Sequence, residues 1–214
     1  MISIIQAAGW PIWPLILCSV LALALIFERF YTLRSRQVLP PTLVDEVIAV
    51  SRRSIPPADV VDKLSTSSVL GGILASGIRA VLADPRLSEQ NLRQVFESAG
   101  REAVHRLERY LNALGTIATA APLLGLLGTV VGMIEIFAAQ APASGGQNPQ
   151  QLAHGISIAL YNTAFGLIIA IPALMFHRYF HARVETFRLG MELAVERMVS
   201  HLIRMGYGNR GSAN

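Results

Sequence analysis

The sequence is short of charge. Only 15% of its 214 residues are charged, whereas a typical soluble domain carries about 25%. Its single cysteine, Cys18, excludes an intrachain disulfide framework. A glycine-rich phosphate loop, a metal-ligand spacing and a nucleophile–base motif are also missing. The sequence therefore carries no signature of a common enzyme class, and we expect no catalytic activity and no cofactor.

The sequence contains long uncharged stretches. Hydrophobic residues make up 52% of the chain, and its mean hydropathy is +0.46. Residues 1–27, 111–134 and 155–176 contain no charged side chain. Each run is close to or above the roughly 20 apolar residues that span a bilayer as a helix. Three transmembrane helices are therefore predicted.

The basic residues are strongly segregated along the chain. Of the 18 lysines and arginines, 12 lie in residues 29–109 and 6 in residues 178–210, and residues 140–154 contain none. Positive charge concentrates on the cytoplasmic side of membrane proteins. This pattern predicts a periplasmic N-terminus and a cytoplasmic C-terminus, and it accounts for the basic balance without nucleic-acid binding.

Start and stop signals divide the chain further, and they indicate an all-α protein. Ser68 and Ser88 precede apolar residues at helical spacing and are good N-caps. No breaker follows the helix after Ser88, which is expected to continue into the second span, where Pro122 can bend it. The predicted parts are an outer N-terminus and first span (1–36), a cytoplasmic helical region (37–108), the second span (109–139), a periplasmic loop (140–152), the third span (153–180) and a cytoplasmic C-terminal helix and tail (181–214).

The second span holds the polar groups that a functional site needs. Thr129 lies near the middle of residues 121–137, APLLGLLGTVVGMIEIF, and Glu135 lies towards their end. Small residues let helix backbones approach closely in a membrane. The predicted helix-packing glycines are Gly125, Gly128 and Gly132 here and Gly166 in the third span.

Counting from the outer ends places two hydroxyl groups at one level. Thr129 is ten residues from Ala139 and Thr163 is ten residues from Ala153, so both are expected about 15 Å deep. Asn162 is a further polar residue at this depth. Two readings remain open: a shared polar site, or threonines that bond a carbonyl of their own helix.

Glu135 is the only acid within these spans, and it is expected to lie only about 6 Å deep. It is either a carboxylate that reaches the interface or part of a functional path. A proton-driven device needs a group that titrates within the membrane. If this chain conducts protons, the titrating acid is expected to come from another chain.

Residues 121–137 and residues 155–174, GISIALYNTAFGLIIAIPAL, resemble the second and third spans of the MotA/TolQ/ExbB proton-channel family. Three spans resemble its ExbB/TolQ branch. The resemblance implies an inner-membrane ring, a homopentamer, with Thr129 and Thr163 in the pore. It also implies a single-span ExbD/TolR-like partner with a membrane aspartate, a TonB-like protein further on, and proton motive force that energises outer-membrane transport, with Na⁺ left open as the ion.

One position departs from the family pattern. ExbB and TolQ usually carry a glutamate five residues before the third-span threonine, and that position here is Ile158. We hypothesise that Glu135, at similar depth on the second span, substitutes for it at the outer mouth of the pore. The alternatives are a TolQ-like or motility-type motor subunit and a membrane scaffold that conducts nothing.

Overall fold

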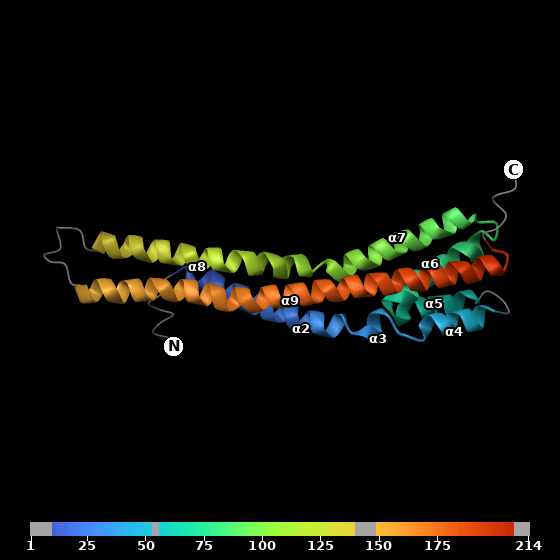
Figure 1. Ribbon diagram of the computed structural model, residues 1–214, viewed down its shortest axis with the longest axis horizontal. Helices are drawn as coiled ribbons and strands as arrows, with labels where there is room; N and C mark the ends of the chain where they lie inside the picture. Colours follow the sequence, from blue (N-terminus) through green and yellow to red (C-terminus); the bar gives the residue numbers. More distant parts are fainter. Residues whose placement is uncertain (1–9, 53–55, 140–148, 208–214) are drawn as a thin grey trace. The chain divides into compact units, whose positions relative to one another are not determined.

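The computed structural model describes residues 10–52, 56–139 and 149–207, and these residues form helices and turns without a strand. The predicted outer segment before residue 10 and most of the predicted 140–152 loop lie outside the described residues. The helices are α2 (Ile12–Thr32), α3 (Ser35–Val38), α4 (Leu43–Ser51), α5 (Ala58–Ser67), α6 (Val69–Ala83), α7 (Glu89–Glu108), α8 (Leu111–Ala139) and α9 (Pro149–Arg204). The predicted all-α class is therefore confirmed (Figure 1).

Three helical stretches are long and apolar enough to cross a membrane: α2, a part of Glu89–Ala138 and a part of Gly155–Arg204. A bilayer core about 30 Å thick takes only about 20 helical residues. The crossing parts of α8 and α9 are therefore their uncharged residues, 111–134 and 155–176. The charged remainder of α9 lies beyond the span.

The chain divides into two compact units. The first, here called the membrane unit, comprises Met1–Arg29 and Tyr110–Tyr179. The second, here called the charged unit, comprises Phe30–Arg109 and Phe180–Asn214 and holds most of the charged residues. Each unit has its own packing, and each is described by itself.

All three spans meet in the core of the membrane unit. Leu15 of α2, Ala121 of α8 and Ala170 of α9 are buried together, with two larger aliphatic side chains packed around them. At the end of α2, Arg29 is buried, forms a two-bond ion pair with Glu28 and lies 4.9 Å from the ring centre of Tyr110. A buried charge in the membrane needs such partners.

In the charged unit, α6 packs against α5 and α7. The side chain of Ser68 accepts a hydrogen bond from the N–H of Gly71 at 3.0 Å, so the predicted cap of α6 is confirmed. Ser88 caps α7 in the same way, accepting from Asn91 at 3.2 Å. Gly77 of α6 leaves the space in which the ring of Phe96 is buried.

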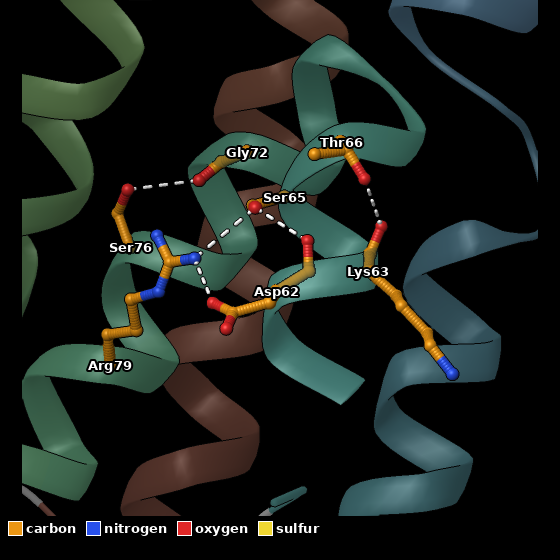
Figure 2. A network of polar contacts seen from close by, with 7 residues as sticks. All are labelled: Asp62, Lys63, Ser65, Thr66, Gly72, Ser76 and Arg79. Carbon is orange, nitrogen blue, oxygen red and sulfur yellow. Dashed lines mark hydrogen bonds and ion pairs between the residues drawn. The ribbon is translucent and has the colours of Figure 1, made fainter. Parts of the chain in front are cut away.

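A polar network also joins α5 to α6. Figure 2 shows the guanidinium of Arg79 on α6 pointing at α5, where it donates to Asp62 at 2.5 Å and to Ser65 at 3.3 Å. The hydroxyl groups of Ser65 and Ser76 donate to carbonyls of their own helices. These exposed contacts fix which side of α6 faces α5 more than they stabilise the unit, because surface ion pairs contribute about 1 kcal/mol or less.

The helix boundaries differ from the prediction in several places, and α9 already begins at Pro149, within the predicted 140–152 loop. The expected uninterrupted helix into the second span is wrong in detail, because α7 ends at Glu108 and α8 begins at Leu111. Tyr110, whose ring Arg29 covers, lies in this interruption. The one-turn helix α3, Ser35–Val38, was also not predicted. Its four residues are too few for a periodic signal.

Candidate functional site

The candidate site lies where the crossing parts of α8 and α9 run side by side in the membrane unit (Figure 1). A Cβ atom added at Gly125 would stand 2.8 Å from the carbonyl oxygen of Asn162. One added at Gly166 would stand 2.6 Å from the carbonyl oxygen of Ala121. The two backbones therefore touch, which only glycine permits at these positions.

The close approach gives Thr163 a partner on the other helix. Its hydroxyl donates to the carbonyl oxygen of Gly125 at 3.2 Å. The hydroxyl of Thr129 instead donates within α8, to Leu126 at 2.7 Å. Both side chains are partly buried. Each hydroxyl donates its one hydrogen to a carbonyl. Its oxygen lone pairs can still accept a hydrogen bond from a donor such as water or a protonated acid.

The two threonines lie at similar levels along the helix pair. The side chain of Asn162 lies against Gly128. A Cβ added at Gly128 would stand 2.7 Å from the Cβ of Asn162. Thr129 follows Gly128 and Thr163 follows Asn162 in the sequence. The two hydroxyl-bearing residues are therefore within about one helical turn of each other in depth.

Asn162 is the most deeply buried polar residue of this contact, with only 1% of its surface exposed. The sequence offered one signal for it, an amide beside Thr163 inside an uncharged run. That signal does not say which face of the helix the amide occupies. The structure places it between α8 and α9, beside Gly128.

A cavity of about 260 Å³ opens beside this amide, and we call it the α8/α9 cavity. Glu135 and Ile158, the two positions compared in the sequence, both line it. Its other lining residues are Pro11, Gly128, Val131, Gly132, Ile136, Gly155, Ala159 and Asn162. The structure therefore brings Glu135, Ile158 and Asn162 to one space, whereas Thr129 and Thr163 are not among its lining residues.

The charged unit has a larger hollow of about 680 Å³ between α7 and α9. Buried Phe96 and Met191 line it, together with the ion pair of Arg93 and Glu196. The Arg93 hydrogen bond lowers the pKa of Glu196 below its ordinary value. Within the described ranges, no group of three or more His, Cys, Asp or Glu side chains is placed to hold a metal ion.

Comparison with known proteins matches residues 65–193 to the model of the MotA/TolQ/ExbB proton channel family. The chain belongs to this family. The biopolymer transport protein exbB1 of Vibrio cholerae is 35% identical to it over 173 residues, which cover 79% of this chain and 74% of that protein. An ExbB-like biopolymer transport protein of Synechocystis is 33% identical over 178 residues, 83% of each chain.

A member of the Tol branch is similar over a shorter stretch. The Tol-Pal system protein TolQ of Haemophilus influenzae is 33% identical over 105 residues, which cover 49% of this chain and 46% of that protein. The matched residues 65–193 include α8 and the crossing part of α9. The family is one of proton channels and transport subunits, and it is not a known class of enzyme.

Proposed function

We propose that this chain is the ExbB-like proton-channel subunit of an inner-membrane complex that uses proton motive force to energise outer-membrane transport. Copies of the chain form a ring, a pentamer, in which α8 and α9 line the pore. The charged unit lies in the cytoplasm, as the distribution of basic residues favours. The two ExbB-type relatives named above align over 74% and 83% of their length and the TolQ relative over 46%, which supports the ExbB-like role over the TolQ-like one.

The observation that carries this proposal is the chemistry of the α8–α9 contact. Its polar side chains at mid-depth are a hydroxyl on each helix and one amide, and none of these titrates at physiological pH. A proton-driven device needs a group that titrates within the membrane, and we take that group to come from another chain. A single-span partner of the ExbD/TolR type with a membrane aspartate meets this need, and the lone pairs of Thr129 and Thr163 accept hydrogen bonds from its protonated form.

The position of Glu135 supports its assignment to the outer mouth of the path. Glu135 on α8 and Ile158 on α9 line the same cavity, so a carboxylate from either helix reaches the same space. In this proposal Glu135 on α8 takes over the role of the glutamate that the family usually carries at position 158 on α9. Protons are the proposed ion, and a comparison with Na⁺ belongs in the same flux assay.

The test is proton flux in proteoliposomes that contain this chain and its single-span partner. T163V keeps the side chain's shape but removes the hydroxyl, and we expect flux to fall by about tenfold or more, while stability changes by only about 1 kcal/mol. E135Q is expected to lower flux as well, and the exchange of both residues, E135I with I158E, is expected to restore it.

Each rival predicts a different result. A scaffold that conducts nothing predicts that T129V and T163V leave the complex fully functional. Unchanged flux in E135Q removes Glu135 from the path. The mass of the intact complex, purified with its partner, gives the number of copies, and a mass that does not fit five copies would overturn the pentamer.

A further inference from the structure

The α8/α9 cavity is large enough to hold several water molecules. Its volume is about 260 Å³, and one water takes about 30 Å³ in the liquid. Cavities in proteins stay dry when their walls are apolar and hold water when polar groups can bond it. The nature of the wall therefore decides what fills this space.

Two polar side chains lie on this wall, one on each helix. On α8, Gly128, Gly132 and Glu135 follow each other by four and then three residues, which places them on one face of the helix. On α9, Gly155, Ala159 and Asn162 are spaced in the same way. Glu135 and the level of Gly128, where Asn162 sits, are seven residues apart, about 10 Å along the helix axis. The cavity therefore extends from a carboxylate near the end of α8 to an amide at mid-depth.

Two glycines of the wall make room for side chains of the opposite helix. A Cβ at Gly128 would stand 2.7–2.9 Å from atoms of the Asn162 side chain, and one at Gly155 would stand 2.6 Å from Ile136. Larger residues at these positions would displace the side chains of Asn162 and Ile136, which line the cavity. Gly128 thus allows the amide of Asn162 to lie at the inner end of the cavity.

We propose that the α8/α9 cavity is a water-filled compartment inside each subunit, which connects Glu135 to Asn162. The amide of Asn162 holds the innermost water, so it is a positioning residue, and the carboxylate of Glu135 bonds water at the other end. Under the proposed function, protons reach the level of Thr163 through this water. The presence of the water itself does not depend on that function.

Thiol labelling tests the compartment without measuring transport. Cys18 is the only native cysteine, so C18S gives a thiol-free background in lipid nanodiscs, where both membrane faces are open to reagent. Single cysteines are then placed at Ile158 and at Ala159, which line the cavity. L160C is the matched control, because Leu160 is next along the helix, 60% exposed and not part of the wall.

A charged methanethiosulfonate reacts with a thiolate, which forms only where water reaches the sulfur. We expect I158C and A159C to react about tenfold or more faster than L160C. Two wall positions are used so that a poorly assembled variant does not decide the result. Equal or slower reaction at both of them would overturn the compartment.

A second pair of variants tests the role of Asn162. In the I158C background, N162L keeps the volume but removes the hydrogen-bonding groups, and we expect labelling to fall to the L160C rate. N162S keeps a hydroxyl and is expected to retain fast labelling. If N162L labels as fast as the parent, Asn162 does not hold the water and the proposal fails. Loss of flux in T163V bears only on the proposed function, so the two failures are distinguishable.

Discussion

Glycine lies against the backbone at some helix contacts of the two units and against a side chain at others. In the membrane unit, Gly125 and Gly166 bring backbone against backbone, so an added Cβ would meet carbonyl oxygens within 2.6–2.8 Å. In the charged unit, Gly77 makes room for a side chain, because an added Cβ would stand 2.0 Å from the Phe96 ring. Neither kind of contact belongs to one unit, because an added Cβ at Gly71 of the charged unit would stand 2.3 Å from the carbonyl oxygen of Leu64, and one at Gly128 of the membrane unit would stand 2.7 Å from the Asn162 side chain.

What such a contact contributes to stability depends on the solvent around it. Lipid tails are as apolar as leucine, so helices in a membrane gain little from burying aliphatic side chains and rely on close packing and hydrogen bonds. The Thr163–Gly125 bond is of this kind. In water, burying apolar surface contributes about 25 cal/mol per Å², and a buried ring such as Phe96 is worth accommodating. The energetic consequence of a glycine contact therefore differs between lipid and water.

The largest expected effect comes from adding one methyl group to the backbone contact. G125A would press on the backbone of α9, which cannot rotate away as a side chain can. We expect a loss of about 2–3 kcal/mol in unfolding free energy, measured by denaturant titration of the detergent-solubilised protein. The Thr163 hydrogen bond to the Gly125 carbonyl should weaken with it.

The charged unit offers a matched control for the same substitution. Gly100 lies inside α7, and an added Cβ there would have no atom within 4 Å. G100A should therefore stabilise the protein by about 0.5–1 kcal/mol through helix propensity alone. If G125A and G100A shift stability in the same direction, the backbone contact at Gly125 does not limit the stability of the protein.

A smaller effect is expected where glycine meets a side chain. G77A should cost about 1–2 kcal/mol, because the buried Phe96 ring has to move. A smaller side chain at position 96 can relieve the clash. We expect G77A with F96L to lose about 1 kcal/mol less unfolding free energy than the sum of the losses in the two single variants, measured in a double-mutant cycle. Additive losses would mean that the two residues are not in direct competition.

Local signals account for what the sequence predicted well. The uncharged runs predicted the three spans, because a bilayer excludes charge whatever the partners are. Ser68 and Ser88 were identified as caps because a capping side chain bonds an N–H only three residues away. Such information is contained in a short window of sequence.

The register of α8 against α9 could not be predicted to the residue. Depth counting from the ends of the spans placed Glu135 close to Ile158, and the two residues line one cavity. Counting could not reveal that Asn162 faces Gly128, because that depends on how both helices are rotated about their axes. The interruption at Tyr110 was not predicted for a similar reason. The contact of Tyr110 with Arg29 joins residues that are far apart in the chain.

The smallest expected effect is a pH dependence confined to the charged unit. His201, near the end of α9 and well beyond the uncharged span, is buried, and among the described residues its Nε2 has no hydrogen-bond partner. Loss of hydration lowers its pKa below the ordinary value, and the positive charges of Arg204 and Arg52 lower it further. The folded unit therefore favours the neutral ring.

This shift fixes the direction of the effect. The unfolded chain has the ordinary histidine pKa of about 6.5, so below that pH it binds a proton more readily than the folded unit does. Stability should be full above pH 6.5 and fall as the pH drops towards the folded pKa, by at most about 1.4 kcal/mol per pH unit. This loss of stability can be measured by hydrogen exchange at the end of α9 between pH 7.5 and 5. H201Q should flatten the profile, whereas H105Q, at an exposed histidine of α7, should leave it in place. A profile that is unchanged in H201Q would assign the pH dependence to other groups.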